Sequence, residues 1–442
     1  ALLEIARRLE ALEAAVDAPA GGPVDVRAPR DDPRLEAIRD VPGVVYRSPA
    51  SVSRPTEGVA LPSMEEVAAD AETHARCFHL FETSRDERQW QECAGMRVVA
   101  NPPWPPLSVE DLDAVYALPF TREVHPVHMG ERVPALEQVR FSVTTHRGCC
   151  GGCAFCAIGS QQGRTVQSRS EESVLAEVRH IAGHAGFRGT VPDVGGPTAN
   201  LYGAECGRGT SCRRVSCLWP RRCPDLRLDQ GRYLSVLRRA ARTPGVRHLF
   251  VTTGIRMDVA LESRAFVRAM AVEFTSGRLK VAPEHLAPHV LALMRKPAGG
   301  EFAAFLAAHR RASEGAGRKQ FLLPYLMAAH PGSRLTDMVD VALFLKRNGI
   351  RVEQVQIFTP TPGTAATAMY ATGLDPATRQ PVFVERDSRR REMQKALLLW
   401  HLPERTADIR EALRLCGRLD AEGELLRGGR GVGGGRRARR SD

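Results

Sequence analysis

The chain has 442 residues, of which 43% are hydrophobic and 26% are charged, a composition typical of a globular protein that buries a real core. Its apolar stretches are short, and one of the longest, 321–329, contains Pro324, so we predict no membrane-spanning helix. The formal net charge is +11, and the first residues form an amphipathic helical pattern and not a secretion signal, which leads us to expect a cytoplasmic protein without a membrane partner.

The chain changes character after its first 136 residues. Residues 1–136 combine short helical patterns with proline-rich loops and carry no catalytic motif. From 137 to 359, short β-type runs alternate with amphipathic helical runs such as 171–184 and 335–347. The predicted strands are 139–145, 190–194, 248–253, 278–282, 320–328 and 352–358.

Six strands that alternate with helices predict a parallel sheet with right-handed connections. The number of strands favours an α/β fold built on an open (β/α)6 partial TIM-type barrel at 137–359, with amino- and carboxy-terminal appendages. We expect an α-rich extension at 360–426 and a disordered Arg/Gly tail at 427–442. Functional groups in such folds gather at the carboxyl ends of the strands, where most of the motifs described below begin.

A first group of cysteines follows the first predicted strand. Cys149, Cys153 and Cys156 are separated by three and then by two residues, so their thiolates could hold three irons of a cubane cluster and leave the fourth iron open. An open iron can bind the amino and carboxylate groups of a methionine moiety. Taken alone, the spacing also suits a zinc knuckle, and Cys150 offers an alternative first ligand with equal spacing.

This cysteine pattern, with Phe155 before the last cysteine, resembles the radical S-adenosylmethionine signature. The resemblance favours Cys149 over Cys150 as the first ligand and places Phe155 over the cluster or near the adenine. After the second strand, Gly195, Gly196, Pro197 and Thr198 are similar to the superfamily's Gly-Gly-Glu element, whose backbone binds the amino group of the methionine. Here Pro197 replaces the acid.

Further polar residues follow later strands. Arg256 follows the third strand, Glu284 and His285 follow the fourth, and His330 follows the fifth. We interpret Glu284 and His285 as ribose-binding groups, and His285 and His330 also as candidate proton carriers. Each of these segments alone is also typical of an ordinary turn between a strand and a helix.

Together the motifs resemble the YgiQ-like family of radical S-adenosylmethionine proteins over about 41–426. The matching segments are Phe141-Ser-Val, Arg147-Gly-Cys, Gln167-Ser-Arg-Ser, Gly195-Gly-Pro-Thr-Ala-Asn, Ala282-Pro-Glu-His, Ala329-His-Pro-Gly and Ala366-Thr-Ala-Met-Tyr. The resemblance implies a [4Fe-4S] cluster, bound S-adenosylmethionine, a 5′-deoxyadenosyl radical and a one-electron donor of the flavodoxin or ferredoxin type. It leaves the substrate open. In that family a further amino-terminal region normally precedes this part, so we expect 1–136 to be a truncated version of the family's amino-terminal region.

A second group contains Cys206, Cys212, Cys217 and Cys223 in a basic loop. Four thiols within eighteen residues could hold zinc or an auxiliary iron–sulfur cluster, or remain as reduced thiols. The arginine-rich tail at 427–442 suits either a solvated segment or an RNA-attracting arm. Two rival functions therefore remain beside the radical enzyme: a zinc-containing RNA-binding protein, and an RNA-modifying radical enzyme similar to the methylthiotransferases.

Overall fold

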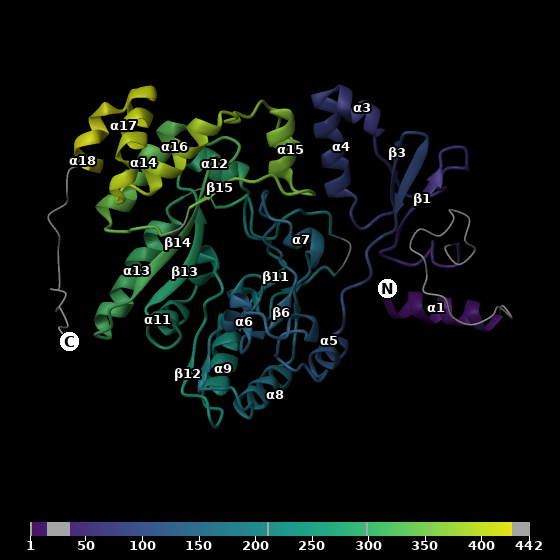
Figure 1. Ribbon diagram of the computed structural model, residues 1–442, viewed down its shortest axis with the longest axis horizontal. Helices are drawn as coiled ribbons and strands as arrows, with labels where there is room; N and C mark the ends of the chain where they lie inside the picture. The colour runs from purple at the N-terminus through teal and green to yellow at the C-terminus, as the bar shows by residue number, and fades with distance from the viewer. Residues whose placement is uncertain (1, 16–35, 210–211, 298, 354, 427–442) are drawn as a thin grey trace.

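A computed structural model describes residues 2–15, 36–209, 212–297, 299–353 and 355–426 (Figure 1). Helix α1 (Leu2–Ala15) precedes a four-stranded sheet in the order β1-β4-β3-β2. Strands β1 (Val45–Pro49), β3 (Gln89–Cys93) and β4 (Met96–Ala100) pair antiparallel, while β2 (Val59–Ala60) is parallel to β3. Helices α3 (Met64–Ala69) and α4 (Ala71–Thr83) connect β2 to β3. Sequence patterns did not predict this sheet.

The segments predicted as core strands lie beside one another in chain order. Parallel pairing joins β5 (Val143–Thr144) to β9 (Val194–Gly195) and β8 (Thr190–Val191) to β12 (His248–Leu249). A parallel bridge between Ile255 and Val281 leads to β13 (Arg278–Glu284), which continues to β14 (Phe321–Ala328) and β15 (Gln356–Ile357). Helices alternate with these strands, so the chain has a mixed α/β fold as predicted. Within the described ranges, no strand pairing connects β15 back to β5.

Several predicted boundaries were wrong for identifiable reasons. Residue 139 ends helix α6 (Pro134–Val139) instead of starting a strand, because proline is favoured in the first turn of a helix. The second strand is split into β8 and β9 around Pro192, which has no backbone N–H to donate to a neighbouring strand. The third and sixth strands are shorter than predicted, whereas α14 (Leu335–Arg347) has the predicted bounds.

The remaining elements surround these strands or extend beyond them. Short strands β6 (His146–Arg147) and β7 (Gln167–Ser168) pair with each other, as do β10 (Glu205–Cys206) and β11 (Leu226–Arg227). The other helices are α5 (Val109–Tyr116), α7 (Ile158–Gln161), α8 (Glu171–Ala182), α9 (Gln230–Ala241), α10 (Met257–Ala260), α11 (Arg264–Val272), α12 (Pro288–Leu293), α13 (Glu301–Gly315), α15 (Ala365–Thr372), α16 (Ser388–Leu398), α17 (Thr406–Leu415) and α18 (Glu422–Leu426).

One buried apolar core joins the strands to helices α8, α9, α11, α13, α14, α16, α17 and α18. Val143, Val191, Leu249, Leu279 and Leu326 contribute to it from successive strands. Among the described helices, none is both long and apolar enough to cross a membrane.

A buried ion pair connects the amino-terminal part to the core. Glu82, near the end of α4, accepts hydrogen bonds at 2.7 and 2.8 Å from both terminal nitrogens of Arg295, which follows α12. Both side chains are about nine-tenths buried. Helix α4 also packs against α15, so residues far apart in the sequence form one interface (Figure 1).

We expect Glu82→Ala to lower the free energy of unfolding by about 3–5 kcal/mol, because it leaves the Arg295 charge buried and unpaired. Urea unfolding of the purified protein measures this loss. Glu424→Ala is a matched control, since it removes the exposed ion pair in which Arg347 binds Glu424 with two hydrogen bonds of 2.7 and 2.9 Å. The control should have a much smaller effect because water screens that pair. Equal losses in the two variants would contradict this account.

Candidate active site

A cavity of about 310 Å³ lies at the carboxyl ends of the core strands. Most of the residues predicted from sequence line it: Cys149, Cys153, Phe155, Cys156, Pro197, Thr198, Arg256, Glu284 and His285. They come from four separate segments of the chain. The parallel order of the strands therefore places these motifs at one end of the fold, as expected for this class of sheet.

The first cysteine group lies on the loop between β6 and α7. Two glycines shape this loop in backbone conformations with positive φ, 76° at Gly148 and 61° at Gly152. A Cβ atom on Gly148 would lie 2.0 Å from the carbonyl oxygen of Thr165, and one on Gly152 would lie 2.1 Å from that of Val215. The loop therefore requires glycine at both positions, for conformation and for close backbone approach.

The environment of the cysteines disfavours isolated thiolates. Burial, with the adjacent Cys153, raises the pKa of Cys149, and burial raises the pKa of Cys156 to about 11. Such thiols lose their protons only when a cation compensates the charge, which a metal centre does. No three His, Cys, Asp or Glu side chains in the described ranges are arranged to hold a single metal ion. A cubane cluster makes a different demand, because each thiolate binds a separate iron, and three partly buried thiols on one loop fit that demand.

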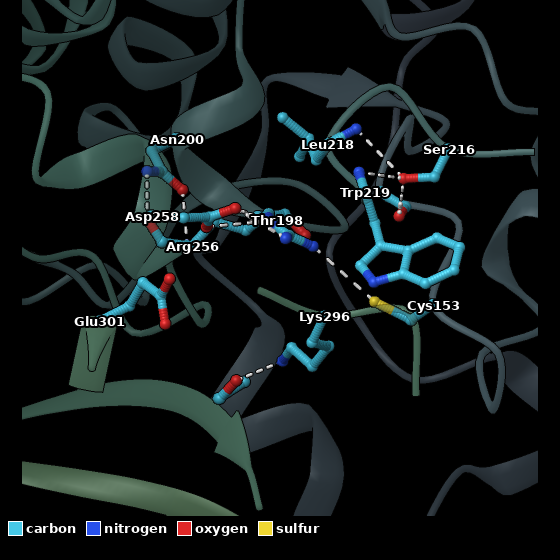
Figure 2. Close-up of polar contacts among 12 residues, drawn as sticks. Cys153, Thr198, Asn200, Ser216, Leu218, Trp219, Arg256, Asp258, Lys296 and Glu301 are labelled. Atoms are coloured by element: carbon cyan, nitrogen blue, oxygen red, sulfur yellow. Dashed lines mark hydrogen bonds and ion pairs between the residues drawn. The ribbon is translucent and has the colours of Figure 1, made fainter. Parts of the chain in front are cut away.

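Arg256 places a permanent positive charge beside the cysteine sulfurs. Its Nη1 lies 3.7 Å from the Sγ atom of Cys153, and its Nη2 donates a 2.8 Å hydrogen bond to Asp258 (Figure 2). Burial alone would lower the pKa of Arg256, but Asp258 and the neighbouring sulfurs raise it. The backbone N–H of Arg256 donates at 2.8 Å to the side chain of Asn200, which donates back to the Arg256 carbonyl at 2.9 Å. The cation is thus held from both its side chain and its backbone.

The residues of the glycine motif after the second strand have two different roles, packing and lining the cavity. Pro197 and Thr198 line the cavity, whereas Gly195 and Gly196 do not. A Cβ on Gly196 would lie 2.5 Å from the ring of His146, so the glycine allows that ring to pack directly on the backbone. The Thr198 hydroxyl lies 3.8 Å from the Sγ atom of Cys149. The motif therefore brings its second half to the cysteines.

The carboxyl group of Glu284 and the imidazole rings of His285 and His330, predicted to follow later strands, are shielded from water. Burial raises the pKa of Glu284, which lies 3.9 Å from the Nζ atom of Lys296. Burial lowers the pKa of His285 to about 3 and that of His330 to about 4, so both rings are neutral at neutral pH. His285 lines the cavity, while His330 packs edge-on against Phe155 with 6.1 Å between ring centroids.

The second cysteine group lies outside the cavity lining. Cys206 is exposed on β10, whereas Cys217 and Cys223 pack in a small apolar cluster with Cys150. The backbone N–H of Cys217 donates to the Cys150 carbonyl at 2.9 Å. Cys217 thus contacts the segment that carries the first group, and the described residues do not gather all four thiols into one site for a single metal ion.

Comparison with known proteins identifies the family. Residues 2–142 match a family model described as Radical SAM N-terminal, and residues 353–426 match one described as a domain of unknown function (DUF3362). UPF0313 protein GSU2873 of Geobacter sulfurreducens is 49% identical over 411 residues, covering 91% of this chain and 67% of the relative. The chain belongs to the UPF0313 family. The matched domain confirms the predicted class, a radical S-adenosylmethionine enzyme, and the relatives confirm the resemblance to YgiQ-like proteins.

Other UPF0313 proteins are longer than this chain as well. One from Methanocella arvoryzae is 38% identical and one from Clostridium perfringens is 39% identical, and the alignments cover 66% and 60% of their lengths. Two solved structures are similar at a lower level. The radical S-adenosylmethionine methyltransferase TsrM of Kitasatospora setae has 15% identity and a TM-score of 0.36, covering 55% of this chain and 42% of that chain. Methylornithine synthase (PylB) has 14% identity and a TM-score of 0.33, covering 72% and 81%. Likeness at this level does not bear on the reaction.

Sequence patterns missed several cavity residues of this UPF0313 chain. Asp258 could have been found, because it lies two residues after Arg256 in a motif that follows a strand. Glu82 and Arg85 had no signal, since they come from the amino-terminal part, where no catalytic motif stands out. The side chain of Arg85 donates to the Gly363 carbonyl at 3.1 Å, and within the described residues it forms no ion pair although it lines the cavity.

We expect Gly152→Ala to destabilise this UPF0313 protein more than Gly163→Ala. Both glycines have positive φ, 61° and 89°, so alanine costs roughly 1–2 kcal/mol in backbone strain at either position. Only at Gly152 would the new methyl group also meet a backbone oxygen, whereas nothing lies within 4 Å of it at Gly163. Urea unfolding midpoints measure the difference. Equal midpoints for the two variants would show that the cysteine-bearing loop accommodates the methyl group at residue 152 without a further loss of stability.

Proposed function

We propose that this chain binds a [4Fe-4S] cluster through Cys149, Cys153 and Cys156 and cleaves S-adenosylmethionine reductively, acting on a substrate still to be identified. The observation that carries this proposal is the meeting of three partly buried thiols with a fixed cation, Arg256, in the cavity of a chain from a radical S-adenosylmethionine family. When bound, a cluster with one open iron supplies the electron that splits S-adenosylmethionine into methionine and a 5′-deoxyadenosyl radical.

The cavity residues would bind and orient the nucleotide. Pro197 and Thr198 would approach the methionine end, because they border Cys149. Glu284 and His285 offer polar atoms to a ribose from the end of β13. Phe155, backed by His330, covers one wall with an aromatic surface. A nucleotide bound against these walls would displace water, and a dry cavity prevents a reactive radical from being lost to side reactions.

The fold proposed to support this chemistry is the open (β/α)6 partial barrel. Six parallel segments in chain order support it, as do the helices between them. We retain the division at 1–136, 137–359 and 360–426, while the tail at 427–442 and the RNA-binding role considered for it lie outside the described residues. A cytoplasmic setting belongs to the same proposal, because all eleven cysteines are free.

The alternatives have less support. A zinc-containing RNA-binding protein requires closed four-ligand sites, and the described part of the chain contains no three-ligand group for a single ion. For the same reason zinc on Cys206, Cys212, Cys217 and Cys223 is not included in the proposal, whereas this finding does not bear on an auxiliary iron–sulfur cluster at these thiols. No observation specifically favours an RNA substrate of the methylthiotransferase type.

Cys153→Ala should abolish both iron uptake and 5′-deoxyadenosine release, because the cluster loses one of three ligands. Anaerobic reconstitution with iron and sulfide, followed by dithionite and S-adenosylmethionine, tests this by iron analysis and chromatography. Cys150→Ala is the matched control, since Cys150 contacts Cys217 in the second cysteine group. It should retain both properties. The proposal is wrong if Cys153→Ala still produces 5′-deoxyadenosine, or if Cys150 proves equally necessary.

Arg256→Gln should shift the midpoint potential of the cluster to more negative values by several tens of millivolts. The reason is that a positive charge and hydrogen bonds near the sulfurs favour the reduced state. Anaerobic redox titration followed by electron paramagnetic resonance measures the shift. Arg239→Gln removes an equal charge from an exposed ion pair with Glu171 on α8 and should leave the potential unchanged. Equal potentials in all three proteins would show that Arg256 has no electronic influence.

A further inference from the structure

The loop between β10 and β11 forms a basic wall directly over the first cysteine group. We call residues 207–225 the basic loop, of which 210 and 211 are outside the described residues. It contains a single acidic residue, Asp225, and these arginines: Arg208, Arg213, Arg214, Arg221 and Arg222. The known class of enzyme does not by itself assign a role to this loop.

The inner side of the basic loop is bonded to the cysteine-bearing loop. The Ser216 hydroxyl donates at 2.7 Å to the Gly151 carbonyl, and the Cys217 N–H donates at 2.9 Å to the Cys150 carbonyl. The same Ser216 oxygen accepts from the backbone N–H groups of Leu218 and Trp219 at 3.1 and 2.9 Å, which fixes the turn (Figure 2). The basic loop is therefore positioned by the peptide that carries Cys149 and Cys153.

The basic loop separates the cavity from the outer surface, and it is thin near Val215. Val215 lines the cavity, whereas its neighbours Arg213 and Arg214 are exposed. Arg164 also lines the cavity and holds the loop by donating to the Arg214 carbonyl at 3.0 Å. A partner that touches the outer face at this point comes close to the cysteines, as electron transfer between proteins requires.

The outer face carries positive charge that its own acids do not neutralise. Arg208 pairs with Asp225, and Arg222 pairs with Glu262. In contrast, the Arg213 side chain is 85% exposed with its acidic partner, Glu87, 3.7 Å away. Arg214 donates to the carbonyls of Ser216 and Arg221, and the exposed Arg221 has no acidic partner among the described residues. These three arginines form the charged centre of the surface.

We propose that the basic loop is the docking surface for an acidic one-electron carrier protein that reduces the cluster. The inference rests on the function proposed above, because it requires a cluster at the first cysteine group. One electron passes from the carrier, which is oxidised, to the cluster, which is reduced, and no other group changes. Complementary charge suits such encounters, since redox interfaces are small and depend on electrostatic steering. An RNA strand is the competing occupant, and the experiment separates the two.

The test compares two reductants on the reconstituted protein. In anaerobic stopped-flow measurements at low salt, reduced flavodoxin should reduce the cluster of Arg213→Glu/Arg221→Glu about tenfold more slowly than that of the unmodified protein. Dithionite, which needs no docking surface, should reduce both proteins at the same rate. Added salt should slow only the reaction of the unmodified protein with flavodoxin, because it screens the attraction.

The matched control reverses two charges at the opposite end of the core strands. Arg311 and Arg318 are exposed on α13 and in the turn before β14, and Arg311→Glu/Arg318→Glu should react with flavodoxin at the unmodified rate. The docking proposal is overturned if flavodoxin reduces the loop variant at full speed, even if that variant loses affinity for an RNA oligonucleotide. It is also overturned if dithionite too reduces the cluster of the loop variant about tenfold more slowly than that of the unmodified protein, since the loop would then have a purely structural role. Failure of the unmodified protein to release 5′-deoxyadenosine with dithionite would instead refute the proposed function.

Discussion

The unfavourable burial of negatively charged sulfur is the constraint around which the site is organised. Burial raises the pKa values of Cys149 and Cys156, and the guanidinium group of Arg256 lies 3.7 Å from the Sγ atom of Cys153 on the same loop. That guanidinium is itself buried and depends on Asp258 for its charge balance. Asn200 holds its backbone from the other side. Sulfur, cation and carboxylate thus form one electrostatic unit that is complete only when a positively charged metal centre joins it.

The parallel order of the strands supplies the frame for this unit. The segments that carry the polar residues lie at the carboxyl ends of different strands, so the fold brings these segments together at one end of the sheet. Fine positioning comes from close backbone contacts instead. Gly148 and Gly152 allow the cysteine loop to touch Thr165 and Val215, and Gly196 allows His146 to pack against the backbone. The site is therefore built by glycine-mediated contact between loops on a regular α/β scaffold.

Sequence patterns predicted those parts of the molecule that are encoded locally. Helix α14 has the predicted bounds, and β13 and β14 lie close to theirs, because their apolar periodicity extends over many residues. The cysteine spacing located three residues that line the cavity, because the motif lies on one short loop. The amino-terminal sheet escaped prediction because β2 has only two residues and β1, β3 and β4 have five each. Glu82 reaches the site through tertiary packing of α4, which no local pattern encodes. Likewise, the spacing of the second cysteine group does not reveal that Cys217 turns toward Cys150.

The thinness of the wall at Val215 has a cost as well as a use. A wall thin enough for electron transfer also leaves dioxygen only a short path to the cluster. Dioxygen is a small apolar molecule and crosses protein more easily than an ion does. The lifetime of a cluster in air would then depend on local opening of the basic loop between β10 and β11. It would not depend on the free energy of unfolding of the whole chain. Tightening that loop should prolong survival under aerobic handling even where the melting temperature does not move.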